Sequence, residues 1–147
     1  MAFNIQDNTG VLIKKAARLF ERVANKDLDK LGVTYAQTIF LVRLWERDGQ
    51  SQAELATSAG LKQPTAVRLL DRMEKDELIT RVRNPEDRRI FNFFLTAKAK
   101  KACKKLEAHA VVMKDISNQA IPDKDIEKLN QLIKRVIHNL QNHLDNS

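Results

Sequence analysis

Helix stop and start signals within residues 51–64 constrain this chain most, because they define two short helices joined by a tight turn. Ser51 and Glu54 have capping-box spacing, in which each side chain bonds the other residue's backbone N–H, so a helix is predicted to begin here. Gly60 suits its end, since glycine readily adopts the left-handed conformation found there. Pro64 suits the first turn of a second helix, where a missing N–H removes no intrahelical hydrogen bond. The sequence therefore predicts a helix-turn-helix.

The second helix, predicted over residues 64–75, separates into two faces. One side of the helix is apolar, and the opposite side carries Thr65, Arg68 and Arg72, which are three and four residues apart. Hydroxyl and guanidinium groups on a helix that is supported from behind fit the major groove of DNA. Arginine can donate two hydrogen bonds to O6 and N7 of guanine, which discriminates bases. The buried stripe, with helical spacing, is predicted to be Ala66, Leu69, Leu70 and Met73.

A two-stranded hairpin is predicted after this helix. Ile79–Arg83 and Ile90–Leu95 alternate partly between apolar and polar residues, as strands do. Residues 84–89 between them are turn-forming and carry paired charges. The predicted fold class is mainly α with a small β-hairpin wing, a winged helix-turn-helix flanked by N- and C-terminal dimerisation helices.

With these motifs the chain resembles the MarR family of bacterial transcription regulators, and within it the SlyA-like subgroup. The resemblance rests on residues 63–68 in the second helix, residues 87–89 at the hairpin tip, and Leu95-Thr96 before the next helix. It implies a two-fold symmetric homodimer and a pocket that admits small aromatic carboxylates. The family usually has glycine where this chain has Glu77. We therefore expect either a non-glycine residue at positive φ or a different connection.

The resemblance implies roles for particular residues. It assigns base reading to Arg68 and minor-groove contact to the wing arginine Arg89. Asp87, two residues away, is expected to hold the Arg89 guanidinium ready. The other predicted contacts, to bases or phosphates, are Gln63, Pro64, Thr65, Arg72, Arg81 and Arg88. For Arg72 the alternative is an ion pair with Asp71 or Asp76, and for Arg81 a solvated side chain.

Helical segments flank the winged head on both sides. Thr9 is predicted to cap a helix that ends at Gly32, and a Thr34–Gln37 capping box opens the next one. Thr96 is predicted to cap a long helix, and the last helix starts near residue 122. We expect residues 1–31 and 97–147 to form the dimerisation region and residues 32–96 the DNA-binding region of a single unit. The predicted dimer contacts are Leu12, Leu19, Ile126, Leu129, Ile133, Val136, Ile137, Leu140 and Leu144.

Composition limits the other function classes. No apolar run approaches the roughly 18 residues that span a membrane, and the N-terminus lacks a signal-peptide pattern, so a cytoplasmic protein is expected. Four glycines leave no room for a phosphate-binding loop or dinucleotide fingerprint, and we expect neither an enzyme nor a bound cofactor. The three histidines lack metal-ligand spacing, so no metal is expected. Cys103 lies on an apolar stripe, which favours packing over a redox role.

The net charge favours a polyanionic partner, but the positive charge is not concentrated in the predicted winged helix-turn-helix. The net charge is +7, whereas residues 51–96 hold eight lysines and arginines against seven acidic residues, a net +1. The placement of individual arginines must therefore carry DNA binding.

The predicted function is a homodimeric, sequence-specific DNA-binding regulator, a repressor or an anti-silencing activator, located at the nucleoid when bound. Its operator would be pseudo-palindromic and A·T-rich, with half-sites ~34–36 Å apart, and a small aromatic or phenolic ligand would modulate it. The alternative is a winged-helix protein-interaction module without sequence-specific DNA readout. The second helix exposes no large apolar anchor, which favours DNA.

Overall fold

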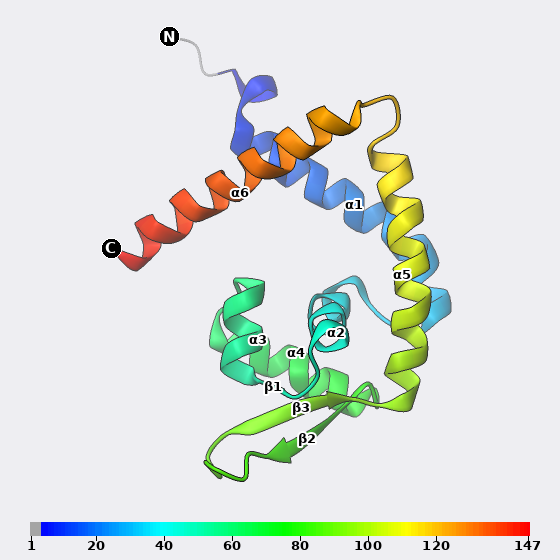
Figure 1. Cartoon of the computed structure of the whole chain (residues 1–147), viewed down its shortest axis with the longest axis vertical. Coiled ribbons are helices and arrows are strands. Elements are labelled where there is room, and N and C mark those ends of the chain that lie inside the picture. The colour runs from blue at the N-terminus through cyan, green and yellow to red at the C-terminus, as the bar shows by residue number, and fades with distance from the viewer. Residues whose placement is uncertain (1–3) are drawn as a thin grey trace. The chain divides into compact units, whose positions relative to one another are not determined.

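The computed structural model describes residues 4–147, which contain six α-helices and one three-stranded antiparallel sheet (Figure 1). The predicted mainly α fold with a small β-hairpin wing is confirmed. The chain divides into two compact units, one up to Ala110 and one from Val111 onward. In chain order the elements are a 3-10 helix Ile5–Asp7, α1 Thr9–Leu31, α2 Tyr35–Glu46, β1 Gln50–Ser51, α3 Gln52–Ala59, α4 Gln63–Lys75, β2 Ile79–Arg83, β3 Phe91–Leu95, α5 Ala97–Ser117 and α6 Asp123–Asp145.

The N-terminal cap of α1 differs from the prediction. Asn8, rather than Thr9, is the N-cap, and its side chain accepts a hydrogen bond from the backbone N–H of Val11 at 3.1 Å. Asparagine is the stronger capping residue, and Asn8 has the extended backbone that an N-cap needs. The predicted end of α1 is confirmed, because Gly32 has the left-handed conformation with φ 71°.

Both predicted capping boxes are present. Thr34 and Gln37 exchange their hydrogen bonds at the start of α2, and Ser51 and Glu54 do so at the start of α3. Gly60 ends α3 with φ 66°, as predicted. The next helix, α4, starts one residue earlier than predicted, at Gln63, with proline in its first turn.

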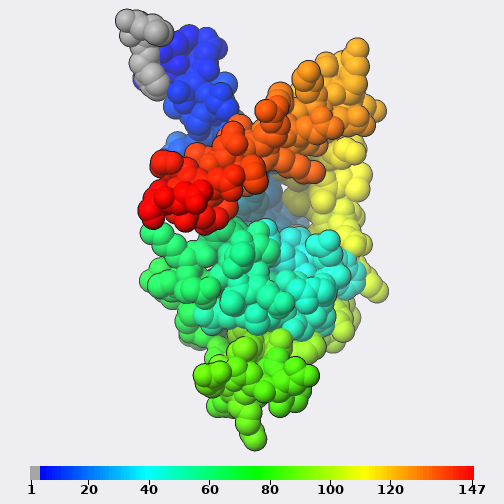
Figure 2. Space-filling view, turned by 60° about the vertical axis from the view of Figure 1, so that its left-hand side comes forward, coloured from blue at the N-terminus to red at the C-terminus, as the bar shows by residue number. Residues whose placement is uncertain are grey.

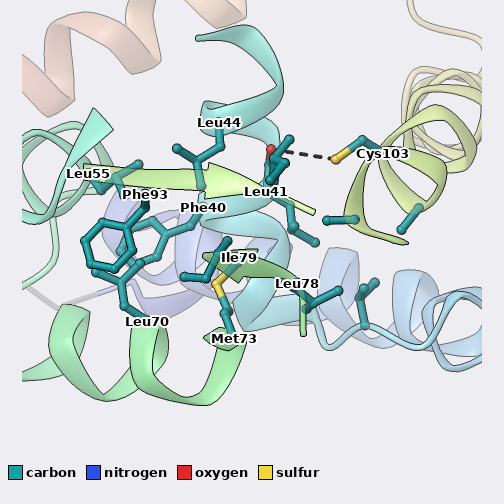
Figure 3. Packing of buried hydrophobic residues seen from close by; sticks show 14 of the residues in the cluster. Phe40, Leu41, Leu44, Leu55, Leu70, Met73, Leu78, Ile79, Phe93 and Cys103 are labelled. Carbon is teal, nitrogen blue, oxygen red and sulfur yellow. Dashed lines mark hydrogen bonds between the residues drawn. The ribbon is translucent and has the colours of Figure 1, made fainter. Parts of the chain in front are cut away.

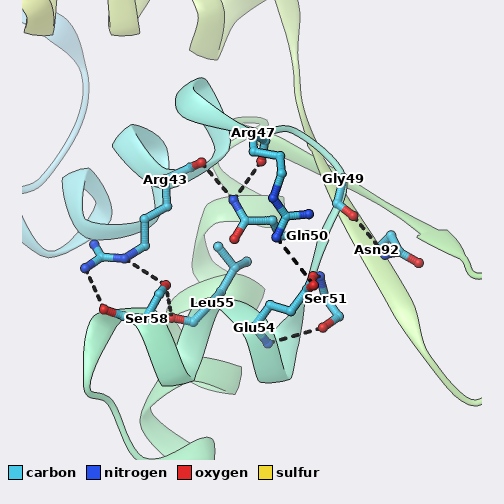
Figure 4. Close-up of polar contacts among 9 residues, drawn as sticks. All are labelled: Arg43, Arg47, Gly49, Gln50, Ser51, Glu54, Leu55, Ser58 and Asn92. Carbon is cyan, nitrogen blue, oxygen red and sulfur yellow. Dashed lines mark hydrogen bonds and ion pairs between the residues drawn. The ribbon is translucent and has the colours of Figure 1, made fainter.

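The sheet has the order β1-β3-β2, and its first strand was not predicted. Gln50 and Ser51 pair with Phe93 and Asn92 of β3. A side-chain bond from Asn92 Nδ2 to the Gly49 carbonyl, at 2.8 Å, supports this edge (Figure 4). A two-residue strand carries no alternation to read, so only its β3 partner defines it. The predicted hairpin forms, although its second strand starts at residue 91 rather than 90.

Buried apolar residues of the first unit form its core around α2 (Figure 3). This helix packs against α1, α3, α4 and β3, so neighbouring elements enclose it. Each fully buried leucine or phenylalanine contributes about 1.5–3 kcal/mol relative to an exposed one. The largest fully buried apolar side chains are Phe40, Leu41, Leu44, Leu55, Leu70, Met73, Leu78, Ile79, Phe93, Leu28 and Cys103.

The helix α5 begins as predicted. Thr96 Oγ1 accepts a hydrogen bond from the Ala99 backbone N–H at 3.1 Å. Three apolar residues of this helix, Ala99, Cys103 and Leu106, are buried, whereas Ala110 is exposed.

The second unit comprises the end of α5 and the helix α6. No residue of α6 is buried. Its apolar residues include Ile137 and Leu144, which are 60% and 68% exposed. Leu12 and Leu19 of α1 are also exposed. The residues predicted to contact a second copy are therefore exposed or half-buried in the single chain.

Candidate nucleic-acid interface

The helix α4 has the two predicted faces. Ala66, Leu70 and Met73 are buried and Leu69 is half-buried, so one side of the helix is fixed to the core. The opposite side, including Arg68, is exposed. Because the buried stripe uses the whole inner face, the polar residues can only point outward.

At the start of α4, the three predicted contacts Gln63, Pro64 and Thr65 are all exposed. The Gln63 side chain is tied to α3, because Gln52 Nε2 donates to Gln63 Oε1 at 3.0 Å. This end of the helix therefore offers polar groups in defined positions.

Arg68 differs from its neighbours on α4 in having no ion pair or hydrogen bond from its side chain within residues 4–147. Asp71, three residues on, pairs with Arg81 instead, at 2.9 Å. Asp76 pairs with Arg72 at 3.1 Å, which confirms one of the alternatives predicted for Arg72. The nearby carboxylates are thus used by other arginines, and the Arg68 guanidinium remains open to an external acceptor.

Arg81 lies inside a network of the head. Its Nε donates to Glu74 Oε2 at 3.0 Å, in addition to the ion pair with Asp71. Its guanidinium also lies 5.1 Å and 5.6 Å from the ring centres of Phe91 and Phe93. These contacts join β2 and β3 to α4. They favour a structural role for Arg81 over the predicted phosphate contact or a solvated side chain.

At the hairpin tip, Arg89 is held by Asp87. The Asp87 carboxylate accepts from Arg89 Nε at 3.1 Å and from Arg89 Nη2 at 3.0 Å. These bonds lower the pKa of Asp87 and raise the pKa of Arg89. Even so, the Arg89 side chain is 90% exposed. Asp87 therefore fixes the direction of a guanidinium whose outer edge stays accessible.

The turn that presents this pair is itself ordered by hydrogen bonds. Asn84 Oδ1 accepts from the backbone N–H of Glu86 at 2.8 Å, and Arg83 Nη1 donates to the Arg88 carbonyl at 2.6 Å. The Arg88 side chain is exposed and makes no hydrogen bond within the described chain. Figure 2 shows the hairpin protruding beyond the helices of the first unit.

Glu77, where the family usually has glycine, adopts a positive φ of 60°. The first of the two predicted arrangements is therefore confirmed. Its carbonyl accepts from Thr96 Oγ1 at 2.7 Å, and its N–H donates to the Glu74 carbonyl at 3.0 Å. The connection from α4 to β2 is thus held at both peptide groups of the strained residue.

Arg43, which sequence reasoning did not single out, joins α2 to α3 (Figure 4). Its guanidinium donates to Ser58 Oγ and to the Ser58 carbonyl, both at 2.9 Å. It lines an open surface hollow of about 770 Å³ between these helices. Because its donors are used within the chain, Arg43 serves the position of α3.

A smaller apolar pocket of about 170 Å³ lies between α2 and α5. Trp45 Nε1 donates to Glu107 Oε1 at 2.5 Å beside it. No lysine or arginine lines it. The lining residues are Val42, Trp45, Cys103, Leu106, Glu107 and Ala110.

Cys103 is a buried thiol. Its Sγ lies 3.8 Å from the Leu41 carbonyl (Figure 3). Burial, with Glu107 and Asp48 adding to it, raises the pKa of Cys103 to about 11. The thiol is therefore uncharged at neutral pH, as a packing role requires.

Within residues 4–147 there is no group of three or more histidine, cysteine or acidic side chains that could hold a metal ion. His109 Nδ1 lies 3.6 Å from Asp27 Oδ2, and His109 Nε2 is buried without a partner among the described residues. None of the helices described here is long and apolar enough to cross a membrane.

Comparison with known proteins shows which proteins this chain resembles in sequence and fold. The sequence profile of the MarR family matches residues 33–91. The uncharacterized HTH-type transcriptional regulator YybA of Bacillus subtilis is 25% identical over 125 residues, which cover 85% of this chain and 83% of YybA. The crystal structure of the SlyA transcriptional regulator is 23% identical, with a TM-score of 0.82 over 87% of this chain and 90% of SlyA. At that identity the likeness to SlyA extends to the fold and does not define a subgroup.

A further solved structure has higher sequence identity. The transcriptional regulator PA3341 is 32% identical to this chain, with a TM-score of 0.79, and the match covers 92% of this chain and 99% of PA3341. The family profile matches the region that contains α2 to β2, where the helix-turn-helix and the start of the hairpin lie. The match to PA3341 covers nearly the whole chain, and the MarR profile matches the winged helix-turn-helix described above. The chain therefore belongs to the MarR family of transcriptional regulators.

Proposed function

We propose that this MarR family regulator is a homodimer that binds a pseudo-palindromic DNA operator sequence-specifically. The observation that carries the proposal is the exposed guanidinium of Arg68 on the outer face of α4, which has no partner among residues 4–147. All of its N–H groups are available to the acceptors of a base edge, whereas Arg72 and Arg81 bond to carboxylates of the same chain.

In this proposal the wing extends the contact to a minor groove. Arg89 enters a narrow, A·T-rich groove, and Asp87 sets its direction. Arg88 contacts phosphate, and Gln63, Pro64 and Thr65 contact bases or phosphates where α4 begins. Arg81 is left out of the contact because two carboxylates already hold it.

Dimerisation is supported by the apolar residues that the single chain leaves uncovered. We propose residues 1–31 and 97–147 as the dimerisation region and residues 32–96 as the DNA-binding region. Two heads related by two-fold symmetry would read half-sites ~34–36 Å apart. The proposed contacts are Leu12, Leu19, Ile126, Leu129, Ile133, Val136, Ile137, Leu140 and Leu144, exposed or half-buried in the chain.

A small aromatic effector remains part of the proposal. Two proteins of the same fold have been solved with ligands: PcaV from Streptomyces coelicolor with its natural ligand, and CouR from Rhodococcus jostii with p-coumaroyl-CoA. The small pocket beside Trp45 is apolar and includes Glu107 but no cationic residue. These features suit an uncharged phenolic ligand better than a carboxylate, which Glu107 would repel. We further propose a SlyA-like role for the protein, in repression or in anti-silencing at the nucleoid.

The alternative function, a protein-interaction module, has less support. The outer face of α4 offers only Pro64 and Val67 as exposed apolar residues, and neither is an aromatic or large aliphatic anchor.

The test is selection of binding sites from random duplexes, followed by anisotropy titrations of the enriched duplex at several salt concentrations. Arg68→Ala should relax the base preference at one position of each half-site and cost about 1–3 kcal/mol. Lys75→Ala is the matched control, because it removes one positive charge from the other end of α4. If no sequence is enriched, or if both variants weaken all duplexes equally, α4 does not read bases.

A further inference from the structure

We propose that a hydrogen bond between Gln37 and Asp76 positions the recognition helix α4, and that the same carboxylate keeps Arg72 away from the DNA backbone. This inference rests on the proposed DNA-binding function and deepens it. It assigns a positioning role to two residues that make no predicted DNA contact.

Gln37 is a fixed anchor point. Its side chain is buried, and its Oε1 accepts from the Thr34 backbone N–H at 3.0 Å as part of the α2 capping box. Since that N–H needs an acceptor, the orientation of the amide is defined and Nε2 must point the other way. There it donates to Asp76 Oδ2 at 2.8 Å. The cap of one helix therefore holds the end of another.

Three helices meet at Asp76, the C-cap of α4. Besides Gln37 from α2, Arg72 of α4 donates to its carboxylate at 3.1 Å. Lys98 Nζ of α5 donates to its backbone carbonyl at 2.9 Å. The bond from Gln37 and the ion pair with Arg72 lower the pKa of Asp76, so the carboxylate is charged at neutral pH. Asp76 is thus the polar link between the recognition helix and its neighbours.

This link supplies direction that apolar packing lacks. The inner face of α4 packs through Ala66, Leu70 and Met73, and apolar contacts are non-directional. Among the side-chain hydrogen bonds of residues 4–147, the bond from Gln37 to Asp76 is the one that joins α2 to α4 or its C-cap. Arg68 lies eight residues before Asp76, about 12 Å along the helix. A small rotation or slide of α4 would therefore move its guanidinium off a base edge.

The same carboxylate limits the charge that α4 presents. Arg72 is exposed and carries one of the positive charges nearest to Arg68. Its pair with Asp76 draws the guanidinium toward the C-terminal end of the helix, and the negative charge of Asp76 repels phosphate. Both effects reduce sequence-independent attraction.

The experiment exchanges donor and acceptor. Gln37→Glu keeps the capping box, because a glutamate accepts from the Thr34 N–H equally well, but turns a carboxylate toward Asp76. We expect the ratio of the affinity for the operator to the affinity for the same duplex with the base pair read by Arg68 changed to fall about tenfold, because the partly buried bond from Gln37 is lost. Phosphate attraction of Arg72 acts on both duplexes and cancels from this ratio. Adding Asp76→Asn to Gln37→Glu restores a donor–acceptor pair in the reverse direction and should bring the ratio back toward the wild-type value. A merely stabilising contact would change the melting temperature and leave this ratio unchanged.

Asp76→Asn alone tests the second part. Its release of Arg72 should steepen the dependence of log Kd on log salt by about 0.9 for each protomer, one phosphate contact. Glu77→Gln, which removes the adjacent charge without touching Arg72, is the control and should leave the slope unchanged. An unchanged slope with Asp76→Asn, or an equal change in both variants, overturns this part of the inference.

The outcomes separate the inference from the proposed function. If the wild-type protein enriches no sequence, the proposed function fails and the inference fails with it. If the wild type is specific and Gln37→Glu keeps the same ratio, only the positioning role fails. Should Gln37→Glu not fold, the exchanged double variant decides, since a folded double variant with lost specificity contradicts the proposal and one with wild-type specificity supports it. Should the double variant not fold either, Asp76→Ala, which removes the acceptor of the Gln37 amide, decides the positioning role by the same ratio.

Discussion

The hydroxyl of Thr96 donates a hydrogen bond to the carbonyl of Glu77 at 2.7 Å, and Glu77 has a backbone φ of 60°. The same oxygen accepts from the Ala99 N–H and so caps α5. One hydroxyl thus joins the connection after α4, the start of the hairpin and the helix α5 that follows it. The conformation of Glu77, unusual for a residue with a side chain, is supported by this bond.

Replacing Thr96 should therefore cost stability. Thr96→Val keeps the shape but loses both hydrogen bonds, and we expect the free energy of unfolding to fall by about 1–2 kcal/mol. Urea denaturation measures the change. Thr96→Ser, which keeps the hydroxyl, should stay close to wild type, and an equal loss in both variants would argue against a role for the oxygen.

Glycine at position 77 should stabilise the protein. A left-handed backbone costs a residue with a side chain about 1–2 kcal/mol, and part of the relief is offset by the greater freedom of glycine in the unfolded chain. We expect Glu77→Gly to raise the free energy of unfolding by roughly 0.5–1 kcal/mol. Glu77→Ala, which keeps a Cβ, controls for the lost charge. A destabilised glycine variant would show that the Glu77 side chain contributes contacts that outweigh its strain.

The wing arginine should recognise groove shape. Arg89→Ala is expected to weaken binding more on a duplex with A·T-rich flanks than on one with G·C-rich flanks, because a narrow minor groove attracts its charge. Asp87→Asn should give a smaller loss of the same kind, since the Asp87 carboxylate orients Arg89 through two hydrogen bonds. Anisotropy titrations on both duplexes test this. Equal losses on the two would mean that Arg89 contacts phosphate only.

The Cys103 thiol should be unreactive in the folded protein. With its pKa raised to about 11 by burial, only about one molecule in ten thousand carries a thiolate at pH 7. Iodoacetamide should therefore label the native protein far more slowly than the urea-unfolded chain, with a rate that rises up to about pH 11. Rapid labelling of the native protein at pH 7 would contradict the packing role.

A charge on the apolar face of α6 should prevent assembly. Leu140 is 62% exposed in the single chain, and in the proposed dimer Leu140→Lys would place an ammonium among apolar side chains. Sedimentation analysis should show a monomer, with operator affinity reduced. Gln141→Lys, on the neighbouring polar position, should leave a dimer. If Leu140→Lys retains the mass of the wild type, this face of α6 does not form the interface.

Features that depend on neighbouring residues could be predicted from the sequence. The capping boxes of Thr34–Gln37 and Ser51–Glu54 need only two side chains three residues apart, and both are present. Asp87 and Arg89 bond across two residues of one turn. The apolar stripe of α4 follows from helical periodicity, so the direction of its polar face was predictable as well. In each case the interacting groups are close along the chain.

Tertiary structure decided the features whose partners lie far apart in sequence. The strand β1 forms because it pairs with β3. The side-chain hydrogen bond at this edge joins Asn92 to Gly49, which lie 43 residues apart in the sequence. Arg81 pairs with Asp71 and Glu74 because the packing of β2 against α4 brings these side chains together. Their spacing in the sequence does not predict these ion pairs. The amide of Gln37 was visible as a cap, but its second bond, to Asp76, required α2 and α4 to pack. Hydrogen bonds between residues close in sequence determine where the helices of this protein begin and end. How those helices and strands pack determines which carboxylate each arginine pairs with.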